Sequence, residues 1–411
     1  MKIRIDIPNF HDKIDLMIDR PSYLKQLKTA VRRSPITALL GPRQCGKTTL
    51  ARIFAQNKKA TYFDLESQPD LRRLENPEMM LGLVPGVVIL DEVQLMPDLY
   101  SVLRVLADRQ GKKARFLILG SASPTMIKSV SETLAGRVEF VELSGFDLQE
   151  TGPQSWKKLW LRGGFPRSFL AKSEEDSLSW RESFIRTFLE RDIPQLGITI
   201  PSTALRRFWT MLAHYHGQTW NASRLASSMG LSDKTIHSYL DILTGTFMIR
   251  QLQPWYENVG KRQIKSPKIY FRDSGILHSL LSLTDQHSLL GHPHVGASWE
   301  GFALEQVLRA LRPPEAFFWA THNKAELDLF FIHGGRRYGV EIKFSEAPLI
   351  TRSMRIAHKD LGLDHLWIIY PGQDKYPVDR TITAWPLKDV KDLPDQMRRG
   401  SVKGNVRTKR A

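Results

Sequence analysis

The chain has 411 residues, 42% of them hydrophobic and 25% charged, which is long enough for two or three domains, each with its own core. Lys and Arg number 59 against 43 Asp and Glu, and the resulting formal charge of +16 favours a polyanionic partner, most simply nucleic acid. The sequence has no apolar run long enough for a membrane span, and its single cysteine, Cys45, excludes an internal disulfide. Both features predict a cytoplasmic protein with no membrane partner.

The first motif is GPRQCGKT, at residues 41–48, which matches the P-loop pattern G-x-x-x-x-G-K-[ST]. An apolar strand is predicted before it, at 36–40, and a helix after it, at 49–55. Backbone N–H groups and the positive end of that helix would then surround a phosphate. Lys47 would reach the β- and γ-phosphates, and the Thr48 hydroxyl would hold Mg²⁺. The predicted ATP-binding residues are Gly41, Pro42, Arg43, Gln44, Cys45, Gly46, Lys47, Thr48 and Thr49.

A second motif, VVILDE at residues 87–92, predicts a buried parallel strand that runs into two acids. Ligands bind at the carboxyl ends of the strands in doubly wound sheets. Asp91 is therefore predicted to lie near the Mg²⁺, and Glu92 to be the base that activates or orients the attacking water. The two motifs predict an ATPase with an α/β core of parallel strands over residues 1–150.

A third strand, at 115–120, is followed by Ser121, and LAGR at 134–137 precedes a further strand at 138–143. This order resembles that of AAA-type ATPases, in which a sensor residue and then an arginine finger follow the acidic strand. By that resemblance Ser121 stands at the sensor position, where Asn is more usual. Arg137 is the candidate finger, with a surface arginine as the alternative. A finger acts on the nucleotide of a neighbouring subunit, so the resemblance implies a homo-oligomer, of which a ring is one form.

Residues 151–199 are predicted to form a helical lid, and residues 200–290 a winged helix. The winged helix would comprise helices at 205–212, 222–229 and 234–243 and wing strands at 248–252 and 268–271. Asn221 and Ser232 are the expected N-caps of the second and third helices. In DNA-binding winged helices the third helix enters the major groove. Winged helices also serve as protein–protein modules, so both roles stay open.

Residues 291–390 carry a second chemical pattern, in which strands are predicted at 326–331 and 338–344. Side chains alternate along a strand, so Glu341 and Lys343 share a face, and Asp328 can meet them from the neighbouring strand. The carboxylates of Asp328 and Glu341 are suitable Mg²⁺ ligands, while Lys343 would position water or stabilise the transition state. A helix from 299 adds Glu300 or Glu305. The rival interpretation is a structural ion pair of Lys343 with Glu326 or Glu341.

The assembled motifs resemble those of bacterial AAA-type ATP-binding proteins with a winged helix and a C-terminal PD-(D/E)XK nuclease-like domain. The likeness is carried by GPRQCGKT, VVILDEVQ, LAGRVE, GGFP, LERDI and ELDLFF…YGVEIKF. It implies Mg-dependent ATP hydrolysis, oligomerisation and a role with DNA. We expect hydrolysis coupled to DNA binding or remodelling, with cleavage by the C-terminal domain as a possibility. The alternative is a regulatory ATPase that acts through protein partners and keeps an inactive nuclease fold. Residues 391–411 are predicted to be a basic flexible tail.

Overall fold

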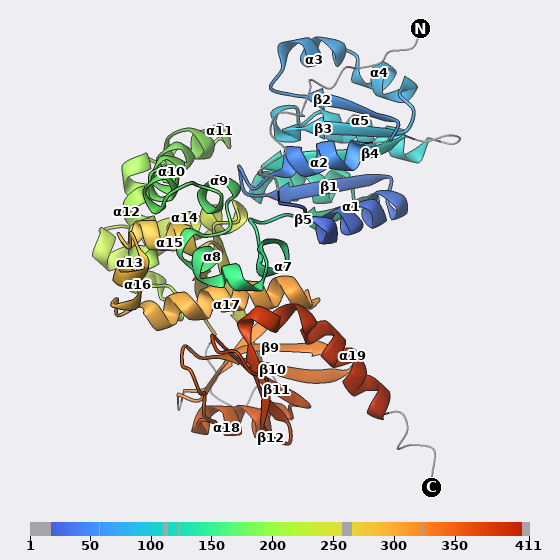
Figure 1. The fold of residues 1–411 in the computed structure, drawn as a ribbon. Coiled ribbons are helices and arrows are strands. Elements are labelled where there is room, and N and C mark those ends of the chain that lie inside the picture. The colour runs from blue at the N-terminus through green and yellow to red at the C-terminus, as the bar shows by residue number, and fades with distance from the viewer. Residues whose placement is uncertain are drawn as a thin grey trace. The chain divides into compact units, whose positions relative to one another are not determined.

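The computed structural model describes residues 18–56, 58–109, 114–121, 124–256, 265–322 and 324–404 (Figure 1). Its chain forms two compact units, the first made of Met1–Phe146 with Asp241–Met248 and the second of Asp147–Leu240 with Ile249–Ala411. The segments predicted as lid, winged helix and nuclease-like domain thus fall almost entirely within the second unit. Residues 257–264, which separate the two predicted wing strands, and the tail residues 405–411 lie outside the described residues.

The first unit is built on a five-stranded sheet whose paired strands all run parallel, in the order β2-β3-β4-β1-β5. The strands are β1 (Ile36–Gly41), β2 (Ala60–Asp64), β3 (Val87–Asp91), β4 (Arg115–Ser121) and β5 (Val138–Glu142). In this register Gly41 lies beside Ser121, and Asp64 lies beside Asp91. The carboxyl ends of the strands therefore share one edge, which confirms the predicted parallel α/β core.

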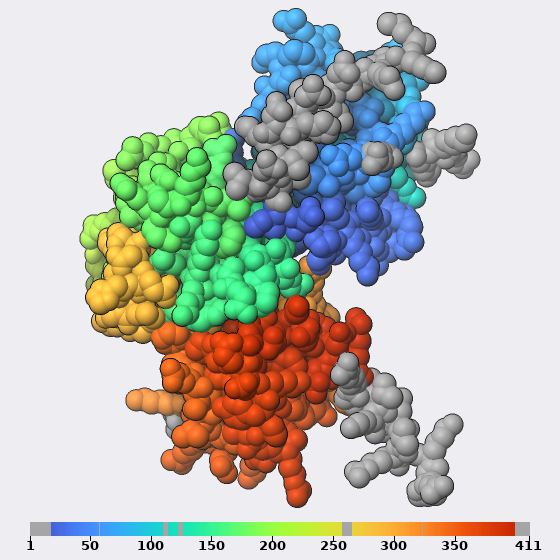
Figure 2. All heavy atoms as spheres, in the orientation of Figure 1, coloured from blue at the N-terminus to red at the C-terminus, as the bar shows by residue number. Residues whose placement is uncertain are grey.

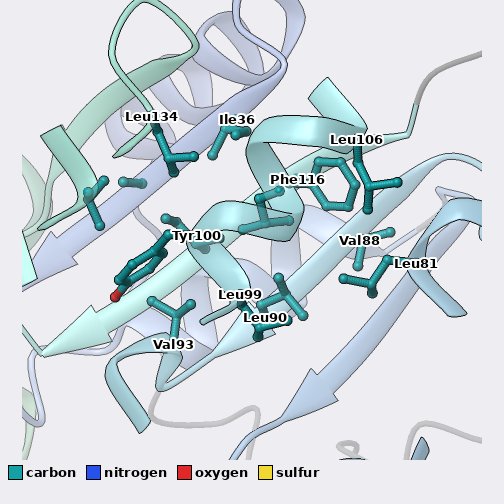
Figure 3. Close-up of a cluster of buried hydrophobic side chains, with 14 of the residues drawn as sticks. Ile36, Leu81, Val88, Leu90, Val93, Leu99, Tyr100, Leu106, Phe116 and Leu134 are labelled. Atoms are coloured by element: carbon teal, nitrogen blue, oxygen red, sulfur yellow. The ribbon is translucent and has the colours of Figure 1, made fainter. Parts of the chain in front are cut away.

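Both faces of this sheet are covered, which explains why its strands are almost continuously apolar. On one face Leu39 and Leu117 pack with Leu50 of α2 (Lys47–Ala55) and with α1 (Pro21–Arg33). On the other face, shown in Figure 3, Val88 and Phe116 pack with the remaining helices. These helices are α4 (Pro77–Leu83), α5 (Leu99–Asp108) and α6 (Pro124–Thr133), and the short helices α3 (Gln68–Arg73) and η2 (Val93–Leu95) complete the unit.

The second unit begins with short helices, of which α10 is the longest before residue 200. They are α7 (Leu148–Thr151), η3 (Pro153–Ser155), α8 (Trp156–Arg162), α9 (Pro166–Phe169), α10 (Glu174–Thr187), η4 (Phe188–Asp192) and α11 (Ile193–Gln195). Then come α12 (Ser202–Ala213), α13 (Ala222–Met229), α14 (Asp233–Gly245) and the antiparallel pair β6 (Ile249–Pro254) and β7 (Lys268–Phe271). The part of α14 from Asp241 onward belongs to the first unit. The two expected N-caps are confirmed, because Asn221 accepts from the Arg224 N–H and Ser232 from the Thr235 N–H, both at 3.1 Å.

The rest of the second unit contains α15 (Ser274–Leu280), α16 (Gln286–Leu290), α17 (Val295–Leu311), α18 (Arg352–Leu361), η5 (Leu387–Asp392) and α19 (Leu393–Gly404). Its strands are β8 (Phe317–Ala320), β9 (Glu326–His333), β10 (Arg336–Ile342), β11 (His365–Tyr370), β12 (Tyr376–Asp379) and β13 (Ile382–Pro386). They join β6 and β7 in an eight-stranded sheet of order β12-β13-β11-β10-β9-β8-β6-β7. The β9–β10 turn uses Gly334 and Gly335 at φ +57° and +75°, a conformation that favours glycine.

Two details differ from the sequence predictions. Strand β10 ends at Ile342, so Lys343 lies just beyond the strand and not inside it. Residues predicted as a flexible tail form α19 as far as Gly404, because Leu393 and Met397, one helical turn apart, are buried. In Figure 2 the red C-terminal residues lie against the green residues near 150, where η5 contacts α7 and η3. None of the helices in the described ranges is both long and apolar enough to cross a membrane.

Candidate functional site

The P-loop joins the end of β1 to the start of α2 and depends on two glycines. A Cβ on Gly41 would lie 2.1 Å from the carbonyl oxygen of Leu143, so only glycine fits there. Gly46 is the N-cap of α2 and has φ 99°. Gln44 also has a positive φ, 63°, while Thr49 lies in the first turn of α2. The loop thus presents the N-terminus of a nine-residue helix, as the sequence predicts for a phosphate site.

Lys47 is folded back over this loop. Its side chain is buried, and Nζ donates to the carbonyl oxygens of Gly41 and Pro42 at 3.0 Å each. The positive charge is therefore already held within the loop by two neutral acceptors. Phosphate oxygens are stronger, charged acceptors, so the ammonium can exchange these carbonyls for a bound phosphate.

The pair predicted to hold Mg²⁺ is assembled at the carboxyl end of β3. The Thr48 hydroxyl donates to Asp91 Oδ2 at 2.7 Å, and the Asp91 side chain is buried. Hydroxyl and carboxylate oxygens are the ligand types that Mg²⁺ prefers, so these residues fit the cation.

Tyr62 is a further residue of this edge that the sequence analysis missed. It lies on β2, next to β3, and its hydroxyl donates to the same Asp91 oxygen that Thr48 contacts. Burial and the Asp91 charge raise the pKa of Tyr62 well above its ordinary value, so the hydroxyl stays protonated and remains a donor. A tyrosine within a short strand carries no motif, and only the sheet register places it here.

Glu92 and Ser121 lie at the same sheet edge as the loop. Glu92 has φ 56°, its N–H donates to Asp91 Oδ1 at 3.0 Å, and its carboxylate accepts from the Gln94 amide. Ser121 pairs with Gly41 in the sheet, and its buried hydroxyl has no hydrogen-bond partner within the described part of the chain. Both predicted residues therefore lie where they can meet a nucleotide bound at the loop.

Arg137 lies at the other end of the sheet. Its carbonyl accepts from the N–H of Ile36, the first residue of β1, while the loop follows the last residue of that strand. At the usual rise per residue the strand separates them by about 17 Å, so Arg137 does not reach the loop of its own chain. Its Nε and Nη2 both donate to the Asp108 carboxylate, at 2.8 Å each. A role in trans remains a prediction.

The back of the loop is fastened by Arg20, which the sequence analysis also missed. Its buried guanidinium donates to the carbonyl oxygens of Cys45, Ser144 and Gly145 at 3.1, 2.9 and 3.2 Å. This ties the loop to the segment that follows β5. Burial raises the pKa of the Cys45 thiol, which keeps the thiol neutral. The Arg43 side chain is only 17% exposed, and its guanidinium lies 3.2 Å from the carboxylate of Glu66.

In the second unit the structure brings Asp328, Glu341 and Lys343 together. Asp328 of β9 accepts from the Ile342 N–H of β10 at 2.8 Å. Lys343 Nζ lies 2.7 Å from Glu341 Oε1, which is one of the ion pairs that the rival interpretation predicts. Burial, with the nearby charges of Glu300 and Glu341, raises the pKa of Asp328 well above its ordinary value.

The acidic cluster consists of Glu300, Glu326, Asp328 and Glu341. Lys268 of β7 occupies its centre. Its buried Nζ lies 3.2 Å from Glu300 Oε1 and 3.7 Å from Asp328 Oδ1, and it also contacts the Glu326 carboxylate. Tyr270, two residues along β7, donates its hydroxyl to Glu300 Oε1 at 2.5 Å. Burial acts to lower the pKa of Lys268, but the surrounding groups, led by Tyr270 and Glu300, raise it well above its ordinary value. Lys268 is therefore an ammonium ion at neutral pH.

This arrangement does not fit the predicted metal role of Asp328 and Glu341. Across the described ranges, no group of three or more His, Cys, Asp or Glu side chains is placed to hold a metal ion. Sequence reasoning could not include Lys268, because it precedes Glu300 by 32 residues and belongs to a strand predicted as a wing.

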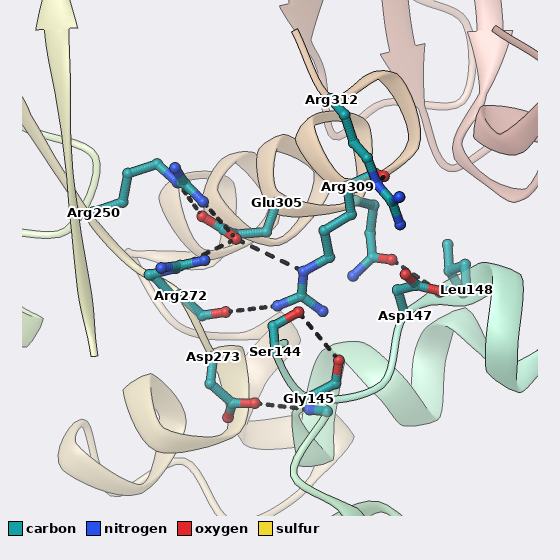
Figure 4. A network of polar contacts seen from close by, with 12 residues as sticks. Ser144, Gly145, Asp147, Leu148, Arg250, Arg272, Asp273, Glu305, Arg309 and Arg312 are labelled. Carbon is teal, nitrogen blue, oxygen red and sulfur yellow. Dashed lines mark hydrogen bonds and ion pairs between the residues drawn. The ribbon is translucent and has the colours of Figure 1, made fainter. Parts of the chain in front are cut away.

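Of the two glutamates predicted on α17, only Glu300 belongs to the acidic cluster. Glu305 faces three arginines instead, as Figure 4 shows. Its carboxylate binds the Arg250 guanidinium, with Nη2 at 3.2 Å, and lies 3.8 Å from Nε of both Arg272 and Arg309. Burial opposes its charge, but the arginines prevail and lower the pKa of Glu305 to about 2. Glu305 is thus a structural anion.

The parallel sheet, its P-loop and the acid at the end of β3 define an AAA-type P-loop protein. Consistent with this, residues 33–152 match the family model described as "AAA domain". Residues 153–287 and 295–390 match two models described as domains of unknown function, DUF8612 and DUF4143. The Walker-type ATPase PABY2304 of Pyrococcus abyssi shares the fold, with a TM-score of 0.50 at 15% identity over 64% of this chain and 96% of that one.

The chain is also similar to whole proteins of known sequence. "Uncharacterized protein Rv2008c" of Mycobacterium tuberculosis and "Uncharacterized protein Mb2031c" of Mycobacterium bovis are each 49% identical to it over 375 residues. These matches cover 91% of this chain and 85% of each relative. The chain therefore belongs to the family of these two mycobacterial proteins.

Proposed function

We propose that the chain hydrolyses ATP with Mg²⁺ at the P-loop. The observation that carries this proposal is the contact of Thr48 with Asp91, 2.7 Å long, beside Lys47 at the start of α2. Lys47 would stabilise charge on the β- and γ-phosphates, and Thr48 and Asp91 would hold Mg²⁺, which neutralises phosphate charge when bound. Glu92 would accept the proton of the attacking water, and the Ser121 hydroxyl would contact the γ-phosphate or that water.

We further propose that hydrolysis is coupled to DNA binding or remodelling. The charge of +16 supports a polyanionic partner. The order of three helices and an antiparallel strand pair, α12 to β7, supports a winged helix. Lys234 and His237 are exposed on α14, the helix that would approach DNA.

Duplex DNA is expected to raise the rate of ATP turnover, and its affinity is expected to fall steeply as salt is added. Each neutralised phosphate releases bound counterions. A plot of the logarithm of the binding constant against the logarithm of the salt concentration therefore has a slope of about −0.9 for each phosphate contact. Fluorescence anisotropy of labelled duplex, with turnover measured in parallel, tests both effects. Lys234→Glu should weaken binding, whereas Lys128→Glu, at an exposed lysine of the first unit, is the matched control. Turnover unchanged by DNA, with no binding even at low salt, would contradict the coupling.

A second candidate is a regulatory ATPase that acts through protein partners and keeps an inactive nuclease fold. The position of Lys268 among the acids favours it, because the cluster already contains a cation. ATP turnover that ignores DNA but responds to a purified protein partner would select this candidate over the first.

In either case Arg137 would act from a neighbouring copy of the chain, since the length of β1 separates it from its own loop. A monomeric mass in the presence of Mg-ATP, measured by light scattering, would rule out this assembly.

A further inference from the structure

The acidic cluster of the second unit brings together more acidic side chains than basic ones, and part of it is buried. Four carboxylates, from Glu300, Glu326, Asp328 and Glu341, face only two ammonium groups, from Lys268 and Lys343. Asp328, Glu341 and Lys268 are all buried. Carboxylates this close repel one another unless a cation or a proton joins them, so the cluster requires a partner of positive charge.

Lys268 supplies that charge from inside the fold. Its Nζ contacts carboxylates from two separate elements, Glu300 of α17 and Glu326 and Asp328 of β9. The Lys268 side chain is only 5% exposed, so its ammonium group is held in place and is not free to move in solvent. Glu341, by contrast, is incompletely paired, because its buried Oε2 has no hydrogen-bond partner among the described residues.

We propose that Lys268 is the resident cation of this cluster and takes the place that a divalent metal would have. The nuclease-like C-terminal fold then binds no metal in its working state and does not cut DNA. The acids instead fasten β7 to α17 and β9 within the second unit. The inference does not depend on ATP hydrolysis, because the P-loop belongs to the first unit.

The physical reason is competition for the same oxygens. Mg²⁺ requires oxygen ligands at 2.0–2.1 Å in near-octahedral order and keeps several waters, whereas a lysine ammonium needs only ion-pair distances. Removing Lys268 leaves the carboxylates buried without their counter-ion, a change that destabilises a protein strongly. The same removal vacates a position surrounded by carboxylate oxygens, which a divalent ion can then enter.

The chain offers a built-in reporter for this test. All ten of its tryptophans, from Trp156 to Trp385, belong to the second unit. Thermal unfolding followed by tryptophan fluorescence therefore reports on the unit that holds the cluster, and metal bound at the P-loop of the first unit does not contribute directly. The probes are Mg²⁺ and Ca²⁺ at millimolar concentration, each added to the full chain.

We expect the Tm of the wild type to be unchanged by either ion. Lys268→Met should unfold at a clearly lower temperature, and Ca²⁺ should recover part of that loss. Adding Asp328→Asn to Lys268→Met should abolish the recovery, whereas Lys268→Arg, which keeps the charge, should not respond to metal.

The proposal can also be overturned with the wild type and one variant alone, should Lys268→Met fail to fold. A wild-type Tm that rises with Mg²⁺ or Ca²⁺, and no longer does so in Asp328→Asn, would mean that the cluster binds metal in spite of Lys268. Metal-dependent cleavage of duplex DNA by the wild type, lost in Asp328→Asn, would overturn it as well. So would a folded Lys268→Met whose Tm matches the wild type with and without Ca²⁺.

Discussion

Lys47→Ala is expected to lower ATP turnover by about 10²- to 10³-fold, the loss typical of removing one charge-stabilising donor from an active site. The reason is local, since Lys47 Nζ already lies within 3.0 Å of two loop carbonyls and has no competing acidic partner among the hydrogen bonds of the loop. The measurement is steady-state phosphate release at saturating Mg-ATP, with nucleotide affinity determined separately.

The matched control is Lys128→Ala, which removes an exposed lysine of the same unit and should leave turnover unchanged. Circular dichroism of both variants checks that the chain keeps its secondary structure. Turnover of Lys47→Ala close to that of the wild type, in a protein with intact secondary structure, would show that the P-loop lysine is not needed for ATP hydrolysis.

Glu305→Gln is expected to destabilise the second unit by about 3–5 kcal/mol at neutral pH, because the change removes the buried negative charge that three partly buried arginines face. Its folded pKa of about 2 lies below the ordinary value of 4.5. A depressed carboxyl pKa stabilises the fold at pH values above 4.5, and that stability is lost as pH falls from 4.5 towards 2. The shift corresponds to about 3 kcal/mol.

Urea unfolding followed by tryptophan fluorescence, at pH 7 and at pH 3, measures this difference in the correct unit. The difference in the free energy of unfolding between wild type and Glu305→Gln should be smaller at pH 3 than at pH 7. Glu315→Gln, at an exposed position, should have the wild-type free energy of unfolding at both pH values. A gap that is small at pH 7, or that widens in acid, would show that the arginines do not hold Glu305 ionised.

The nucleotide site could be predicted from sequence because its determinants are local. A P-loop is a continuous run of residues, and the strand ending in Asp91 is recognisable from its own apolar run. The contributions of Tyr62 and Arg20 were not predictable in this way. Tyr62 reaches Asp91 only through the pairing of β2 with β3, and Arg20 reaches Cys45 from the N-cap position before α1.

The acidic cluster was only half predictable, for the same physical reason. Asp328 and Glu341 lie on adjacent strands of a hairpin, so alternation and a short turn were enough to bring them together. Lys268 comes from β7, which is three strands away from β9 in the sheet order. No local pattern links it to the acids. The sequence likewise could not show which of Glu300 and Glu305 belongs to the cluster. In the structure Glu300 faces Lys268, whereas Glu305 faces Arg250.

Hydrolysis of ATP by the first unit through Asp91 and Glu92 is tested most directly by following radiolabelled ATP bound to the wild type and to Glu92→Gln in Mg²⁺. The wild type should release phosphate and stop doing so when Mg²⁺ is chelated. Glu92→Gln should bind ATP and retain it unhydrolysed, because the residue that accepts the proton of the attacking water is gone. Phosphate release by Glu92→Gln at the wild-type rate, or a wild type that binds no ATP, would contradict the account.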